Sequence, residues 1–214
     1  MQKFSLSCAG LLAIMISGSL SAAPLAKLEA FDFFKLGMPY QDLVSMKASC
    51  DSLKDSPKFR DSLEQGVAST VCPTSETFAM ATLVHNTVAS VAVNWISWDL
   101  SKIKAVSPAL SYIPGKLRSA YGIPSTTLPY ESEFGNKEAD ELCASPDFTC
   151  QMHVWKAKSP DRVASLVYAK NSQGEVPLLF NLTDLSLEGK IEEIKNRGLQ
   201  AAINKVKNEI NDAH

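Results

Sequence analysis

Two stretches of alternating apolar residues constrain the fold of this chain most strongly. The segments "TVASVAVNW" (Thr87–Trp95) and "RVASLVYAK" (Arg162–Lys170) share Val-Ala-Ser followed by further alternating apolar residues. Such alternation predicts half-buried β-strands, because successive side chains of a strand point to opposite faces of the sheet. The shared pattern predicts one strand used twice in two similar halves. Chance recurrence of a Val-rich strand is the alternative.

The first half, residues 24–105, predicts a short helix followed by a β-hairpin. Pro39 suits the first turn of a helix, where its missing N–H costs nothing, and the helix is expected to end near Cys50. A polar loop follows. Two runs rich in Val, Ala and Thr then enclose a two-residue turn, as in a tight hairpin: Phe78–Val84, His85-Asn86 and Thr87–Ile96.

The second half, residues 106–184, predicts the same kinds of element. A helix is expected to start at Pro114 and to end at "YGIP", where Gly122 accepts a positive φ and Pro124 prevents continuation. A polar, loop-like stretch follows. Three strand candidates separated by turn residues come next: Cys150–Ala157, Val163–Ala169 and Val176–Leu182. The predicted fold class is α+β, with two similar helix-plus-antiparallel-strand halves and a sheet covered on one face by helices.

The C-terminal segment, residues 185–214, predicts two amphipathic helical pieces with a bend or break near Gly198. Apolar residues form one stripe before this glycine and another after it: Leu187, Ile191 and Ile194, then Leu199, Ile203, Val206 and Ile210. Glycine inside a helix costs roughly 1 kcal/mol relative to alanine, which favours a hinge there. Two interpretations stay open. Either both stripes cover the sheet, or the second projects and binds a partner helix or a second copy of the chain.

The N-terminus, residues 1–23, has the order of a secretory signal peptide. Lys3 precedes an apolar stretch, Leu11–Ile16, and small residues, Ser17–Ala23. The apolar stretch is shorter than the roughly 20 residues that span a bilayer. We therefore expect cleavage near Ala23, a periplasmic or secreted location, and no membrane span after cleavage. An uncleaved anchor is the alternative.

Four cysteines follow the predicted signal: Cys50, Cys72, Cys143 and Cys150. An even number of cysteines in an exported chain predicts disulfides. Sequence allows three pairings, and we prefer Cys50–Cys72 with Cys143–Cys150, because each bridge then closes a local loop in its own half. The spacing C-x-x-C is absent from the sequence, which argues against a redox site or a zinc knuckle.

One short segment in each half resembles a known family of envelope proteins. The sequence "LGMPYQDL" is similar to the opening of the BamE (SmpA/OmlA) family, and "LRSAYGIP" is similar to that family's helix ending. The matching positions are Gly37, Met38, Asp42, Leu43, Gly122 and Pro124. The β-lactamase-inhibitor proteins share the layout of helix pairs on a sheet, in tandem. The resemblance implies an antiparallel sheet with helices on one face, used to bind a partner protein. The chain departs from the BamE family in lacking its lipoprotein cysteine.

The sequence offers no recognisable catalytic or metal site. Its three histidines, His85, His153 and His214, lack metal-ligand spacing, and no nucleophile elbow, P-loop or dinucleotide-binding pattern occurs. We therefore predict no cofactor and no catalytic residues. Mixed charges, with a net charge of -2, argue against a nucleic-acid partner.

A non-enzymatic binding protein that docks a partner protein in the cell envelope is the preferred hypothesis. The partner is another envelope protein or a second copy of the chain. The possible contact residues are apolar and include two tryptophans, a residue type enriched in interface hot spots: Trp95, Trp98, Leu199, Ile203, Val206 and Ile210. Core packing of the tryptophans is the alternative to this role. The alternative functions are a hydrolase without a recognisable motif and a small-ligand carrier that uses the sheet face.

Overall fold

The computed structural model describes residues 28–46, 57–74, 77–97, 100–131, 136–158, 161–191, 193–194, 196–197 and 200. Several predictions concern residues outside these ranges. They include the signal peptide, Cys50, Trp98 and the second apolar stripe of the C-terminal segment.

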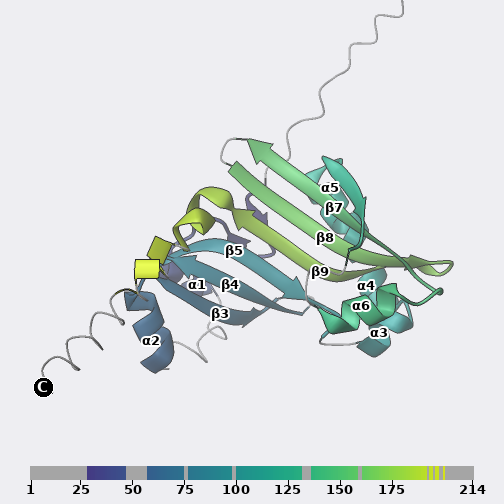
Figure 1. The fold of residues 1–214 in the computed structure, drawn as a ribbon, viewed down its shortest axis with the longest axis horizontal. Helices are drawn as coiled ribbons and strands as arrows, with labels where there is room; N and C mark the ends of the chain where they lie inside the picture. Colours follow the sequence, from purple (N-terminus) through teal and green to yellow (C-terminus); the bar gives the residue numbers. More distant parts are fainter. Residues whose placement is uncertain are drawn as a thin grey trace, which may run out of the picture.

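A mixed α+β architecture with one seven-stranded antiparallel sheet forms the body of the protein (Figure 1). The strand order is β3-β4-β5-β9-β8-β7-β6. The strands are β3 (Val67–Pro73), β4 (Phe78–Val84), β5 (Thr87–Asn94), β6 (Thr126–Pro129), β7 (Thr149–Lys158), β8 (Asp161–Asn171) and β9 (Gly174–Asp184). A separate two-stranded sheet pairs β1 (Ala30–Phe31) with β2 (Phe34–Lys35).

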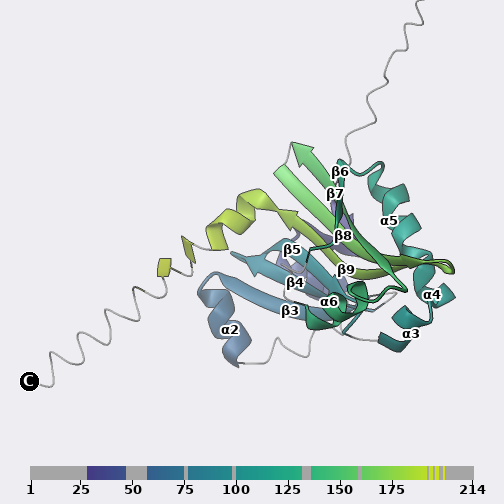
Figure 2. The ribbon, with the colours of Figure 1, turned by 45° about the vertical axis from the view of Figure 1, so that its right-hand side comes forward.

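Short helices lie around this sheet. They are α1 (Tyr40–Met46), α2 (Pro57–Glu64), α3 (Leu100–Lys104), α4 (Pro108–Ser111), α5 (Ile113–Tyr121) and α6 (Lys137–Cys143). Residues 185–191 are also helical. Helices α3, α4 and α5 contact β9, while α2 contacts β3. Figure 2 shows α3, α4 and α5 gathered near one end of the sheet, with the helical residues 185–191 near the other end.

The first predicted hairpin is confirmed. Strand β4 spans the predicted Phe78–Val84, and β5 ends two residues earlier than predicted. His85 and Asn86 have φ values of 46° and 61°. Positive φ at both central residues is what a two-residue turn needs to match the twist of its strands. The helix ending at "YGIP" is also confirmed, because α5 stops at Tyr121 and Gly122 has φ 78°.

Two stretches predicted as loops contain regular structure instead. The polar segment before Cys72 contains α2 and most of β3, and the stretch after Pro124 contains β6 and α6. Helix α2 carries Phe59, which is buried against Tyr40 with ring centroids 5.4 Å apart. Leu63, four positions further along α2, lies on the same helix face and also packs against the core. Two apolar residues in an otherwise polar segment give only a weak helical period in the sequence.

The two Val-Ala-Ser strands occupy different places in the sheet. The sheet consists of two meanders, β3-β4-β5 and β7-β8-β9, which join where β5 pairs with β9, and β6 extends the second. Val88-Ala89-Ser90 lies in β5, the last strand of its meander, whereas Val163-Ala164-Ser165 lies in β8, the middle strand. The sequence match therefore aligns strands that are not equivalent, and it does not by itself support a repeat.

The main core combines buried side chains of the strands with buried side chains of the helices. Its largest fully buried side chains include Trp95, Trp155, Phe180 and Phe34. The Trp155 indole N–H donates to the carbonyl oxygen of Gly122 at 2.9 Å, which fixes the end of α5 against β7. Successive side chains of a strand point to opposite faces of the sheet. Alternate residues of the strands therefore face away from this core.

The predicted Cys143–Cys150 disulfide is confirmed, with an S–S distance of 2.03 Å. It connects the end of α6 to the beginning of β7. Cys72 is also disulfide-bonded, and Cys50, the partner predicted for it, lies outside the described residues.

Candidate functional site: an apolar groove on the sheet

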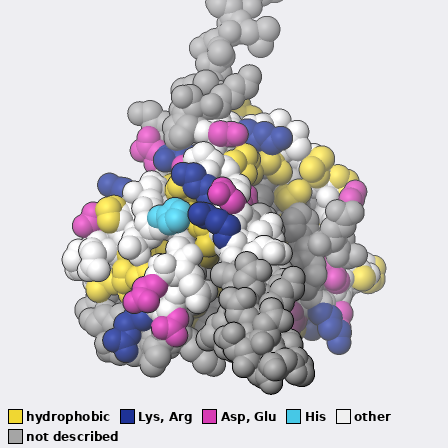
Figure 3. Space-filling view, turned by 60° about the vertical axis from the view of Figure 1, so that its left-hand side comes forward, with side chains coloured by type: hydrophobic (Ala, Val, Ile, Leu, Met, Phe, Trp, Pro, Cys, Tyr) yellow, Lys and Arg dark blue, Asp and Glu magenta, His cyan; other side chains and the backbone are white. Residues whose placement is uncertain are grey.

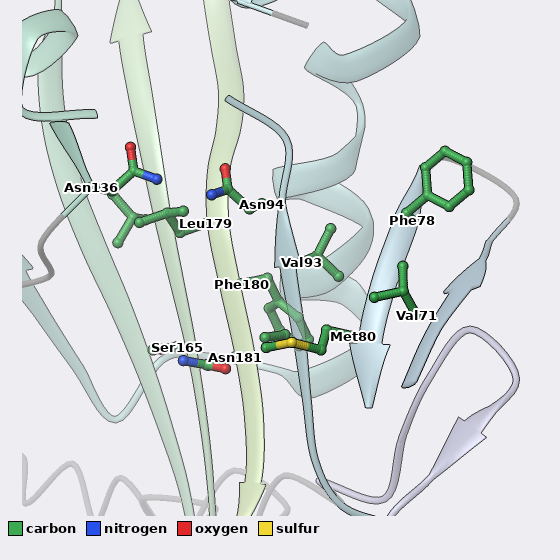
Figure 4. A pocket seen from close by; sticks show the side chains of 12 residues that line it. Val71, Phe78, Met80, Val93, Asn94, Asn136, Ser165, Leu179, Phe180 and Asn181 are labelled. Carbon is green, nitrogen blue, oxygen red and sulfur yellow. The ribbon is translucent and has the colours of Figure 1, made fainter. Parts of the chain in front are cut away.

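Large apolar side chains are exposed on the side of the sheet that faces away from the core. Val71 on β3 and Phe78 and Met80 on β4 are 38%, 42% and 44% exposed. With Ala92 on β5 and Leu179 on β9 they line a cavity of about 450 Å³ (Figure 4), which we call the groove. Ligand pockets usually have volumes of about 300–1,000 Å³.

The alternation of β4 explains why these side chains are exposed. Ala79, Ala81 and Leu83 lie in one phase of the strand and are buried in the core. The other phase begins with Phe78 and Met80 and therefore faces the opposite side. An ordinary half-buried strand carries polar residues in its outward phase, so two large apolar residues there depart from the expected pattern.

Neutral polar groups border one side of the groove (Figure 4). They are Asn94, Asn136, Ser165 and Asn181, and none of the described residues that line the groove is charged. The Asn94 side-chain oxygen accepts from the backbone N–H of Ser97 at 3.0 Å. The Asn136 side-chain oxygen caps α6 by accepting from the backbone N–H of Ala139 at 2.9 Å. Because these oxygens are already bonded, each amide retains its NH₂ group as the donor for an occupant.

The first part of the C-terminal segment covers the opposite end of the same sheet face. Leu187, Ile191 and Ile194 pack against Val67, Val84 and Ala89. The predicted first stripe therefore packs on the sheet. Coverage reaches the β4–β5 turn end of the sheet and leaves the end with Val71, Phe78 and Met80 exposed.

A buried histidine on the core side of β7 has the contacts of a structural residue. His153 is 8% exposed, and its Nδ1 lies 2.9 Å from the Thr127 hydroxyl. Arg118 donates to Nε2 at 3.5 Å and to Glu175 at 2.6 Å. Burial and the nearby Arg118 charge lower the pKa of His153, although Glu175 opposes them. The imidazole is thus held neutral between two partners.

A buried ion pair joins the beginning of β8 to the end of β9. Arg162 Nε lies 3.3 Å from Asp184 Oδ2, and Arg162 also donates to the Leu28 carbonyl oxygen at 3.2 Å. Asp184 accepts from the backbone N–H of Ser186 at 3.1 Å, at the start of the helical residues 185–191. This pair fixes the direction in which the C-terminal segment leaves β9.

Trp95 was predicted as a possible partner contact, and its burial corrects that prediction. Its side chain is only 2% exposed and packs edge-on against Phe31, with ring centroids 6.3 Å apart. It follows directly after β5 on the core side, so it is not available to a partner. Trp98, Leu199, Ile203, Val206 and Ile210 lie outside the described residues.

The groove residues Val71, Phe78 and Met80 were not among the predicted contact residues. The available signal was that both phases of β4 are mainly apolar: Phe78, Met80 and Val84 in one phase, and Ala79, Ala81 and Leu83 in the other. Such a strand has an apolar face on each side of the sheet.

The described residues contain few features that suggest catalysis. Neither His85 nor His153 bonds to a serine hydroxyl there, and no group of three or more His, Cys, Asp or Glu side chains among them could hold a metal ion. Figure 3 shows a face on which acidic and basic side chains are interspersed with hydrophobic ones.

No helix of the described chain is long and apolar enough to cross a membrane. No protein-family model, curated protein or solved structure matches this chain.

Proposed function

We propose that this chain is a non-enzymatic binding protein of the cell envelope that docks a partner polypeptide in the groove. The observation that carries the proposal is the row of exposed apolar side chains at Val71, Phe78 and Met80. Exposed apolar patches on a folded domain are typical of interaction sites. The uncharged lining favours an apolar partner segment over a charged one.

The location is part of the same proposal. The signal-like residues 1–23 and the Cys143–Cys150 disulfide support export to the periplasm or the outside of the cell. The paired meanders support two similar halves, and the likeness to the BamE family at Gly37 and Met38 supports a role in binding proteins.

A charge placed in the groove tests the proposal. Met80→Asp is expected to weaken retention of an envelope polypeptide at least tenfold, because a carboxylate would be desolvated against apolar surface. Ile123→Asp is the matched control, since Ile123 is 79% exposed and does not line the groove. The measurement is quantitative mass spectrometry of proteins retained by each immobilised variant, after melting curves have shown that both fold. Equal retention by Met80→Asp and wild type would count against the groove.

A carrier of small neutral ligands is the second candidate function, favoured by the cavity of about 450 Å³ and its amide-lined side. The neutral apolar dye N-phenyl-1-naphthylamine is a suitable probe. Saturable dye fluorescence that Met80→Asp abolishes, together with unchanged polypeptide retention, would favour the carrier.

A further inference from the structure

The groove crosses β3, β4, β5, β9 and β8, which are neighbours in the sheet. One row of directly opposed residues runs along its floor from β3 to β8: Val71, Met80, Ala92, Asn181 and Ser165. All of them line the groove. Because neighbouring strands lie about 4.8 Å apart, the four spacings from β3 to β8 make the groove roughly 19 Å long across the strands.

The chemistry of the floor changes along this row. On β3 and β4 the floor is apolar, with Phe78 beside Met80, and both side chains are exposed. On β9 and β8 the same row continues with an amide and a hydroxyl, Asn181 and Ser165. The groove therefore has an apolar side over β3 and β4 and a polar side over β9 and β8.

Two further amides present NH₂ groups on the polar side. The side-chain oxygens of Asn94 and Asn136 accept from the backbone N–H groups of Ser97 and Ala139. The nitrogen of each amide is then the atom left to bond an occupant. Figure 4 shows these two nitrogens turned toward each other, near Leu179. An occupant of the groove therefore needs hydrogen-bond acceptors on this side.

The floor of side chains also selects the secondary structure of a polypeptide occupant. An extended segment buried on apolar side chains would leave its backbone N–H and C=O groups without partners, which costs free energy. An α-helix satisfies these groups internally and buries only its side chains. The exception is its last turn, where four C=O groups have no partner within the helix. These carbonyl oxygens are the acceptors that amide NH₂ groups can bond.

We propose that the groove binds the C-terminal end of an apolar α-helix of a partner protein. The apolar face of that helix packs on Val71, Phe78 and Met80, and its last carbonyl groups accept from the amides of Asn94 and Asn136. About 13 residues of helix span the roughly 19 Å of the groove. The carbonyl end of a helix carries a partial negative charge, which is complementary to N–H donors. The inference rests on the proposed function, and it adds the secondary structure and the direction of the docked segment.

Replacing each amide by a carboxylate tests the acceptors of the occupant. Asn136→Asp keeps the oxygen that caps α6, and aspartate is as good an N-cap as asparagine. It exchanges the NH₂ donor for an oxygen that repels a carbonyl group and loses its hydration on docking. Asn136→Asp and Asn94→Asp are each expected to lower retention of the envelope polypeptide at least tenfold.

The matched control is Asn171→Asp. The Asn171 side-chain oxygen also accepts from backbone N–H groups, those of Gln173 and Gly174, but this residue does not line the groove. Retention by Asn171→Asp should equal that of the wild type. Melting curves establish that all three variants fold.

Photocrosslinking from two positions measures the secondary structure and the direction of the occupant. The photoreactive residue p-benzoylphenylalanine replaces Phe78 on β4 in one variant and Ser165 on β8 in another, and mass spectrometry identifies the partner residues that each one labels. Three strand spacings, about 14 Å, separate β4 from β8. This distance corresponds to about ten residues of helix or about four residues of an extended chain. We expect labelled residues about ten positions apart, with the residue labelled from position 165 nearer to the partner's C-terminus.

The outcomes separate this inference from the proposed function. A spacing of about four residues, the reverse order, or unchanged retention by both Asn136→Asp and Asn94→Asp would overturn the helical C-terminal end. If Met80→Asp abolishes retention while the two asparagine variants do not, the proposed function stands and only this inference is rejected. Equal retention by Met80→Asp and wild type, or no labelled polypeptide from either position, rejects both.

Discussion

Replacing Asp184 with asparagine tests how the C-terminal segment is anchored. The Arg162 and Asp184 side chains are 14% and 8% exposed. Removing one partner of a buried ion pair costs about 3–5 kcal/mol, because the other charge stays buried without compensation. Asp184→Asn keeps an oxygen for the Ser186 N–H, and Arg162 keeps its bond to Leu28, so we expect the lower end, about 3 kcal/mol.

The assay is urea unfolding at pH 7, supported by thermal melting. For a domain of this size, a loss of about 3 kcal/mol corresponds to a fall in melting temperature of roughly 6–12 °C. The control is Glu141→Gln, which removes an exposed ion pair with Lys137 and should change stability by less than about 0.5 kcal/mol. If the stability of Asp184→Asn lies within about 1 kcal/mol of the wild type, the size of one ordinary hydrogen bond, the anchoring role is refuted.

The pH dependence adds a second check on the same residue. Burial alone raises the pKa of Asp184, but hydrogen bonds from Ser186 and Arg162 and the Arg162 charge outweigh burial and hold this pKa below its ordinary value. The contribution is therefore fully present above the unfolded-state pKa of about 3.9 and is lost as the pH falls through the lower folded-state pKa. The stability difference between wild type and Asp184→Asn should shrink over that range.

Three further predictions concern the rest of the fold. Because burial and Arg118 lower the pKa of His153, the free energy of unfolding should fall as the pH drops below about 6.5. His153→Gln should remove this pH-dependent part of the stability. An identical pH profile in wild type and His153→Gln would contradict the prediction. Replacing both Cys143 and Cys150 with serine should cost about 2–3 kcal/mol in denaturant unfolding, because their short loop is no longer closed; no loss would mean that other contacts fix α6 on β7. The buried hydroxyl of Thr70 has no hydrogen-bond partner among the described residues, so Thr70→Val should stabilise the protein by about 1 kcal/mol; destabilisation of that size would show that the hydroxyl is bonded.

Local sequence patterns predicted the elements that have a strong local cause. The hairpin around His85 and Asn86 follows from turn chemistry, and the end of α5 follows from Gly122 before Ile123 and Pro124. The Cys143–Cys150 bridge follows from proximity in the chain. In each case the deciding residues lie within a few positions of one another.

Features that depend on distant partners were not predicted. Helix α2 is held by the contact of Phe59 with Tyr40, and β6 exists because its residues pair with β7. The burial of Trp95 depends on Phe31, far away in the sequence. The groove needs β4, β5 and β9 side by side, and the β5–β9 pairing joins segments that no local pattern connects.

A photoreactive amino acid at Phe78 gives the most direct test of the central claim that the groove is a polypeptide-docking surface. The benzophenone side chain of p-benzoylphenylalanine replaces Phe78 in one variant and Ile123 in the control, and cells producing each full-length variant are irradiated. We predict a covalent adduct with a polypeptide, either a second copy or another envelope protein, at position 78 and none at position 123. Absence of an adduct at position 78, or equal adducts at both positions, would contradict the account.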